Sequence, residues 1–240
     1  MFNLNYGLWY YLSNEAEVIT GSMQYMLLTV GFVIISMAAG YFLGSINSAI
    51  IISKIFYGDD IRKHGSGNAG MTNMLRTFGR RAATWTFIGD FLKGALVVFI
   101  ARYICSEYGI GFDVAYVASI FVIIGHIYPL YFKFKGGKGI ATALGAMFVL
   151  NWIAFMTIAV GIIPMVFIIK IVSAVCLCGT CLYPVLNFVL LWLQGKNMMT
   201  EVIPYTVLAI IMALTIFYAH RENIVRLRNG TEPSFGSKKK

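Results

Sequence analysis

Long apolar runs alternate with short polar segments along most of the chain. A membrane-spanning helix needs roughly 20 consecutive apolar residues. Six runs reach the usual range of about 17 to 25 residues or exceed it, at 26–56, 82–104, 114–132, 152–169, 172–194 and 202–219. A seventh run, 140–151, is too short, so we expect a half-span or a helix that dips into the bilayer beside a polar site. The pattern predicts an all-α, polytopic transmembrane helix bundle with seven spans, one of them a short half-span.

The composition supports the same class of protein. Hydrophobic residues make up 59% of the 240 residues and charged residues only 12%, and the mean hydropathy is +0.76. This leaves too little polar surface for a soluble globular protein. The apolar runs leave no room for a separate soluble module, so 1–240 is predicted to be a single integral membrane domain. Residues 1–24 contain no Lys or Arg, so we expect no cleaved signal peptide.

The distribution of basic residues predicts the orientation. Lys and Arg near the ends of spans lie preferentially in the cytoplasm. With the N-terminus outside and seven crossings, sixteen of the nineteen Lys and Arg residues fall on the cytoplasmic side. If 140–151 did not cross, the basic C-terminus would lie outside. We therefore expect a multi-pass protein of the cell membrane with a cytoplasmic C-terminus, and the net charge of +9 needs no nucleic-acid partner.

The first polar segment, 60–76, is rich in glycine and neutral hydrogen-bond donors. Gly65, Gly67 and Gly70 permit close backbone approach and positive φ angles, so successive N–H groups can converge on an anion. Arg76 adds a guanidinium group suited to phosphate oxygens. The neutral donors are Ser66, Asn68, Thr72 and Asn73. The segment predicts a phosphate cradle, and the alternative is a flexible polar loop between spans.

The second polar segment, 125–142, places glycines and lysines directly before the short apolar run. Backbone donors and a helix N-terminus would both face an anion bound there, with Lys135 and Lys138 as positive charges. A Walker A loop is excluded, because Lys138 is followed by Gly139 instead of Ser or Thr. The sequence therefore does not support ATP hydrolysis. The alternative is a basic cytoplasmic loop with hinge glycines.

The C-terminal segment, 220–232, places His220 and Asn223 on one helical face, where they can hold a hydroxyl or a phosphate. A solvated basic tail is the alternative.

Within a span, Asp90 and Lys93 can pair across one helical face, as a functional site or as a self-paired structural group. Three cysteines in the run 172–194 have no neighbouring His or carboxylate, so no metal site is predicted.

In this order and spacing, the three segments resemble the bacterial acyl-phosphate-dependent glycerol-3-phosphate acyltransferase family. The resemblance covers nearly the whole chain. Its matching stretches are Gly44-Ser45-Ile46, Asp60-Ile61-Arg62, Gly65-Ser66-Gly67-Asn68, Thr72-Asn73 to Arg76, Asp90 with Lys93-Gly94, Gly125-His126 with Pro129, Phe134 to Gly139, and His220 with Asn223-Ile224, Arg226-Leu227, Gly230 and Glu232. The chain departs from the family in two places. Asn47 stands where the family usually has Pro, and 170–176 keeps only Ser173 of a serine-rich run.

The resemblance implies transfer of a fatty acyl group from an acyl phosphate to the 1-hydroxyl of glycerol 3-phosphate. The products would be lysophosphatidate and inorganic phosphate, in phospholipid biosynthesis. An acyl phosphate is already an activated mixed anhydride, so no cofactor, metal or covalent nucleophile is expected. The active site would lie at the cytoplasmic face, with the acyl chain between spans and a monomer as the expected form. The main alternative is an organophosphate or anion transporter, whose signature would be an internal repeat; we find none.

Roles for particular residues follow from the resemblance and from this chemistry. Arg76, Lys138 and His220 are predicted to be catalytic, and either His220 or a substrate phosphate would take the proton of the attacking hydroxyl. The predicted substrate-binding residues are Ser66, Gly67, Asn68, Gly70, Thr72, Asn73, Lys135, Gly136, Gly137, Gly139, Ser173, Asn223 and Glu232.

Overall fold

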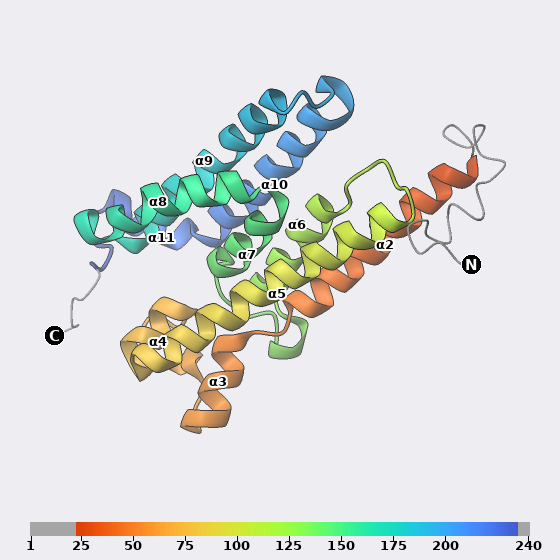
Figure 1. Cartoon of the computed structure of the whole chain (residues 1–240). Coiled ribbons are helices and arrows are strands. Elements are labelled where there is room, and N and C mark those ends of the chain that lie inside the picture. The colour runs from red at the N-terminus through yellow and green to blue at the C-terminus, as the bar shows by residue number, and fades with distance from the viewer. Residues whose placement is uncertain (1–22, 235–240) are drawn as a thin grey trace.

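The computed structural model describes residues 23–234, and this part of the chain consists of helices and connections without strands (Figure 1). Predictions for the chain before residue 23 and for 238–240 concern residues outside this range. The helices are α2 (Met23–Gly44), α3 (Ser48–Tyr57), α4 (Met71–Phe78), α5 (Arg80–Glu107), α6 (Ala115–Ile127), α7 (Ile140–Leu150), α8 (Trp152–Ile169), α9 (Val172–Leu193), α10 (Ile203–Ala219) and α11 (Arg221–Arg228). Short 3₁₀ turns lie at Ile61–Lys63 and Leu130–Phe132, and a π-helical turn lies at Met198–Val202.

Within residues 23–234, five helical stretches are long and apolar enough to cross a membrane. α5, with 28 residues, is also long enough, but it carries Asp90, Lys93 and Arg102 along its length. The five stretches are Met23–Tyr57, Ala115–Phe132, Trp152–Ile169, Val172–Leu193 and Met198–Ala219. The predicted all-helical, polytopic membrane bundle is confirmed at this level. The number of seven crossings stays a prediction.

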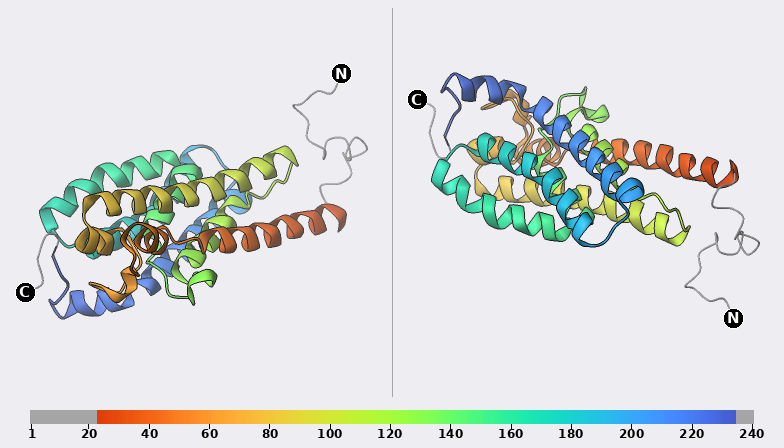
Figure 2. Two further views of the ribbon diagram at one scale, coloured as in Figure 1. Left: turned by 90° about the horizontal axis from the view of Figure 1, so that it is seen from below. Right: turned by 90° about the horizontal axis from the view of Figure 1, so that it is seen from above.

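The long helices lie side by side, and the polar segments gather toward one end of the bundle (Figures 1 and 2). That end contains α3, α4, α11 and the turn between α8 and α9. The start of α2 and the connections from α5 to α6 and from α9 to α10 lie toward the opposite end. The first segment and the C-terminal segment are therefore at the same end of the molecule.

The run 26–56, predicted as one span, is broken into two helices. α2 ends at Gly44, and α3 begins after Asn47, whose side chain caps it by accepting a hydrogen bond from Ile50 N at 3.1 Å. Capping by Asn satisfies a backbone donor that a continuous helix would have used internally. The Ile46 carbonyl, freed by the break, accepts a hydrogen bond from Lys93 Nζ at 2.8 Å. Hydropathy alone misses this break, because the residues on both sides of it are apolar.

Glycines allow two pairs of helices to pack with their backbones in close contact. On α2 and α6, a β-carbon at Gly44 would overlap the Val122 backbone, and one at Gly125 would overlap the Tyr41 carbonyl. On α5 and α7, a β-carbon at Gly94 would overlap the Thr142 carbonyl. Small residues at helix contacts are typical of membrane bundles, where close van der Waals packing replaces the hydrophobic driving force. These contacts fix α5, α6 and α7 around the second segment.

α7 is short, as the sequence predicts. Its 11 residues span about 16 Å, roughly half the hydrocarbon thickness of a bilayer. The helix begins directly after Gly139, which has a φ of 83° that favours glycine. Six of its residues, including Thr142 and Gly145, are buried in the bundle. The N-terminus of α7 is therefore held inside the protein, at the end of the second segment.

Candidate active site

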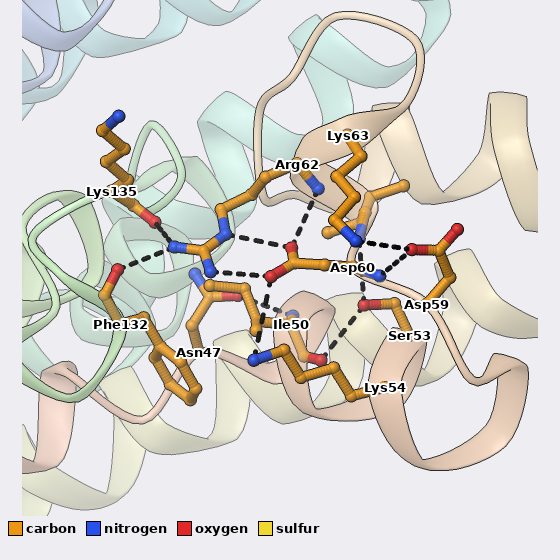
Figure 3. A network of polar contacts seen from close by, with 11 residues as sticks. Asn47, Ile50, Ser53, Lys54, Asp59, Asp60, Arg62, Lys63, Phe132 and Lys135 are labelled. Atoms are coloured by element: carbon orange, nitrogen blue, oxygen red, sulfur yellow. Dashed lines mark hydrogen bonds and ion pairs between the residues drawn. The ribbon is translucent and has the colours of Figure 1, made fainter.

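The first and second segments are in direct contact through their backbones. Ala69 N donates to the Gly136 carbonyl at 3.3 Å. The Arg62 guanidinium reaches across and donates to the carbonyls of Phe132 (2.7 Å) and Lys135 (3.2 Å), as Figure 3 shows. We call these contacts the segment junction. Two glycine-rich loops about 70 residues apart in sequence thus form one structural unit.

Arg62 is itself held by a carboxylate of the first segment. Its Nε and Nη2 donate to the two oxygens of Asp60 at 2.9 and 2.7 Å, a two-point pair that fixes the plane of the guanidinium (Figure 3). The Arg62 hydrogen bonds hold the pKa of the Asp60 carboxyl at about 2. Asp60 is therefore charged at neutral pH. No role was predicted for Asp60 or Arg62, and the structure shows that Arg62, held by Asp60, joins the two segments.

Asn73 organises the first segment from within. Its side chain is 2% exposed. Its Oδ1 accepts from Ser66 N at 3.1 Å, and its Nδ2 donates to the carbonyls of Ile61, His64 and Asn68 at 3.3, 3.0 and 3.0 Å. The polar atoms of Asn73, predicted to bind substrate, are thus engaged with the loop backbone. This geometry favours a positioning role, in which Asn73 shapes the turn that carries Ser66 and Asn68.

Several predicted binding side chains remain unengaged. Ser66, Thr72, Arg76 and Lys135 are exposed. Within residues 23–234, the side chains of these residues and of Asn68 make no hydrogen bond or ion pair. Hydroxyl groups, a guanidinium and an ammonium of these two segments therefore remain available to a ligand.

The glycines of the second segment serve packing more than hydrogen-bond donation. Gly136 N and Gly137 N donate to the carbonyls of Ile127 and His126, both at 3.1 Å, so these two amides are not open to an anion. A β-carbon at Gly137 would overlap the His126 ring and lie 2.6 Å from the Ala69 carbonyl. Any amides of this segment that are open to an anion therefore lie after Gly137. The first helical bond of α7 runs from Ala143 N to Gly139 O, so the preceding N–H groups are outside the helical pattern.

Lys138 links this unit to the C-terminal segment. Its Nζ donates to Asn223 Oδ1. Asn223 Nδ2 donates to Glu232 Oε1 at 2.5 Å, and Ser173 Oγ of α9 donates to the same oxygen at 2.7 Å. Arg226 Nε donates to Glu232 Oε2 at 2.7 Å. These five residues form what we call the Lys138 network.

The charges in the Lys138 network influence one another. Burial lowers the pKa of Lys138, and the nearby Arg226 cation lowers it further. Burial would raise the pKa of Glu232, but hydrogen bonds from Ser173, Asn223 and Arg226 outweigh burial and leave it below the usual value. Glu232 is thus the anion that balances two cations.

His220 lies beside this network, between α10 and α11. It is 3% exposed, and its ring Nδ1 lies 2.9 Å from the Ile216 carbonyl. A carbonyl oxygen can only accept, so Nδ1 carries the proton of the neutral ring and Nε2 is left as an acceptor. Burial lowers the pKa of His220, which favours this neutral form. An acceptor nitrogen is the form of histidine that can orient or deprotonate a hydroxyl.

Comparison with known proteins decides the family. The sequence matches the glycerol-3-phosphate acyltransferase family over residues 34–230. The chain belongs to the glycerol-3-phosphate acyltransferase family. A family member from Clostridioides difficile is 41% identical, over 87% of this chain and 97% of that protein. A member from Chromobacterium violaceum is 37% identical over 83% and 93% of the two chains.

Solved structures of related proteins support the same family assignment. The crystal structure of PlsY (YgiH), an integral membrane glycerol 3-phosphate acyltransferase, in its glycerol 3-phosphate form is 33% identical, with a TM-score of 0.72 over 85% of this chain and 96% of that one. The lysophosphatidic acid form gives 32% identity and a TM-score of 0.71. The family predicted from the three segments is confirmed, and membership favours an enzyme over the alternative of a transporter.

One contact of the buried pair Asp90 and Lys93 was not predicted from the sequence. The pairing predicted for Asp90 and Lys93 is present, with Lys93 Nζ 2.9 Å from Asp90 Oδ1. Lys93 Nζ also lies 2.8 Å from His126 Nδ1 of α6. His126 lies 33 positions from Lys93, and no local spacing indicates such a contact. We call Asp90, Lys93 and His126 the buried triad.

Proposed function

We propose that the protein transfers an acyl group from an acyl phosphate to the 1-hydroxyl of glycerol 3-phosphate, releasing lysophosphatidate and inorganic phosphate. Relatives named glycerol-3-phosphate acyltransferase, and a related structure in glycerol 3-phosphate and lysophosphatidic acid forms, support the acceptor and the product. The observation that carries the proposal is the Lys138 network, because it brings the second segment, α9 and α11 to one cation.

The reaction needs groups that hold two anions and stabilise charge in transit. The acceptor oxygen attacks the acyl carbonyl, the bond from that carbon to the phosphate oxygen breaks, and phosphate leaves. Lys138 would bind and stabilise the phosphoryl oxygens. The unengaged Arg76 and Lys135 would bind a phosphate at the segment junction. Ser66, Asn68 and Thr72 would add neutral donors there.

The C-terminal segment would hold the acceptor. His220 offers Nε2 as an acceptor for the attacking hydroxyl, and Asn223 and Glu232 lie in the same network as Lys138. Burial disfavours a protonated His220, so a substrate phosphate oxygen is the proton acceptor that we propose. His220 would then orient the hydroxyl without taking its proton.

We also propose the membrane arrangement. Seven crossings, an outer N-terminus and a cytoplasmic C-terminus would place the basic end of the bundle at the cytoplasmic face, where the substrates would bind, and the protein would act as a monomer. The gathering of the polar segments at one end supports this (Figure 1). Single cysteines introduced at positions 133 and 196 would test it: a membrane-impermeant thiol reagent should label position 196 from outside and position 133 only after permeabilisation.

The activity is tested with purified protein in detergent or a lipidic phase. Acyl phosphate and glycerol 3-phosphate should yield lysophosphatidate and stoichiometric inorganic phosphate, with EDTA present and no nucleotide. Reactions without protein or without glycerol 3-phosphate measure spontaneous hydrolysis. Activity only with acyl-CoA would contradict the proposed donor, and no lysophosphatidate from either donor would contradict the proposed function.

A further inference from the structure

The buried triad lies against Gly137 of the second segment, through the ring of His126, and none of its members is among the proposed binding groups. Asp90 is 1% exposed and His126 is 3% exposed. Lys93 Nζ lies 2.9 Å from Asp90 Oδ1, 2.8 Å from the Ile46 carbonyl and 2.8 Å from His126 Nδ1. An ammonium has three N–H donors and no acceptor, so these three contacts use all of its donors. His126 Nδ1 must then accept, and the proton of the neutral ring is on Nε2.

The Nε2 edge of the ring meets the segment junction. A β-carbon on Gly137 would overlap His126 Nε2 and would lie 2.6 Å from the Ala69 carbonyl, so these groups face the same side of Gly137. The His126 carbonyl also accepts from Gly137 N at 3.1 Å. Within residues 23–234, Nε2 has no hydrogen-bond partner. His126 therefore contacts Gly137 from its backbone and from its ring.

Gly137 directly precedes Lys138, so a shift of Gly137 moves the point from which Lys138 extends toward Asn223. We propose that His126 is a positioning residue for the acyl transfer: anchored by Lys93, it supports Gly137 against Ala69 and thereby aligns Lys138 with the substrate phosphoryl group. This inference rests on the proposed function. It also explains the Asp90–Lys93 pair, because Lys93, paired with Asp90, holds the His126 ring in place.

Two substitutions separate the two contacts of the ring. His126→Asn keeps an oxygen near the position of Nδ1, where it can accept from Lys93, but leaves nothing against Gly137. His126→Gln places an amide near the position of Nε2, against Gly137, but removes one of the three acceptors of Lys93, leaving Asp90 and the Ile46 carbonyl. We expect His126→Asn to keep a melting temperature close to wild type and to lower kcat about tenfold or more, since small misplacements of a catalytic group have effects of this size. We expect His126→Gln to lower the melting temperature more but to keep kcat within about threefold while folded.

The matched control is His64→Asn. His64 lies in the first segment, where its Nε2 is 2.6 Å from Asp59 Oδ2 and its side chain is partly exposed, and this variant should keep wild-type kcat. Losses of kcat in the two His126 variants that follow their melting temperatures would show a purely structural role and overturn the inference. Wild-type kcat in His126→Asn would also overturn it. These comparisons of kcat require wild-type protein that catalyses acyl transfer. If the wild-type protein shows no acyl transfer, the proposed function is overturned, and this inference with it.

Discussion

The segment junction and the Lys138 network are joined by different kinds of bonds. At the junction, backbone groups provide most contacts: Ala69 N to Gly136 O, and the Arg62 guanidinium to two carbonyls. In the network, side chains bind side chains, from Lys138 through Asn223 to Glu232. Backbone contacts depend on the path of the chain, whereas side-chain contacts depend on the identity of each residue. Substitutions should therefore impair mainly stability at the junction and mainly turnover in the network.

The largest expected effect is at the residue that links the two regions. Lys138→Met keeps much of the apolar stem but removes the cation that would stabilise the phosphoryl oxygens. We expect kcat to fall about 100-fold or more, as is typical when an electrostatic donor to a transition state is removed. Phosphate release from acyl phosphate and glycerol 3-phosphate measures this.

The control for Lys138→Met is Lys133→Met. Lys133 belongs to the same segment, is exposed and makes no ion pair within the described residues, so its loss should leave kcat unchanged. Near-normal turnover in a folded Lys138→Met protein would remove Lys138 from the mechanism and leave the segment junction as the only candidate cradle.

Glu232→Gln tests the network two contacts beyond Lys138, on the far side of Asn223. The amide keeps the shape of the side chain but loses the charge that pairs with Arg226 at 2.7 Å. Because Asn223 is held between Glu232 and Lys138, we expect kcat/KM to fall about tenfold, or about 1.4 kcal/mol. Glu222→Gln, at an exposed position of α11 in the same C-terminal segment, should have little effect. Equal activity in the two variants would show that the charge of Glu232 is not needed.

His220→Gln distinguishes orientation from proton transfer. Glutamine can place an acceptor oxygen near the position of Nε2, but it is not a base at neutral pH. If a substrate phosphate takes the proton, kcat should fall by less than about tenfold and the pH profile should keep its shape. A loss of about 100-fold, together with loss of an ionisation from the pH profile of kcat, would instead assign the proton transfer to His220.

The sequence predicted the membrane bundle and the short α7, because apolar runs are local signals. Of the Lys138 network, Lys138, Ser173, Asn223 and Glu232 were predicted as site residues, Ser173 and Glu232 through the family resemblance, and Arg226 was not. The sequence missed the break after Gly44, since Ser45 and Asn47 are short polar residues within an apolar run. It also missed the contact of His126 with Lys93 and the reach of Arg62 to Phe132, because nothing in a single sequence encodes distances between segments 33 or 70 residues apart. It also did not reveal that the Gly137 amide donates to the His126 carbonyl, because in a sequence a glycine that provides close packing looks the same as a glycine that provides open amide donors.

Asn73→Ala should affect stability more than turnover. It would leave the carbonyls of Ile61, His64 and Asn68 without the Nδ2 donor, and Ser66 N without its acceptor. Net contributions of about 1 kcal/mol per hydrogen bond suggest a loss of about 2–3 kcal/mol, or about 5–10 °C in melting temperature. Turnover below that temperature should change by less than about threefold. A loss of turnover without a loss of stability would instead support the direct substrate contact that the sequence predicts for Asn73.

The smallest expected effect is a difference in pH dependence between wild type and Glu232→Gln. The pKa of Glu232 lies below its usual value in the folded protein, so its hydrogen bonds contribute stability that is fully present above the unfolded pKa of about 4.3. That contribution is lost as the pH falls through the lower, folded pKa. Wild type should therefore melt at a higher temperature than the variant at pH 6, and the two melting temperatures should converge as the pH is lowered below about 4. A constant difference down to pH 3 would mean that the stabilisation comes from the shape of the side chain and not from its charge, and the network would then resemble the segment junction.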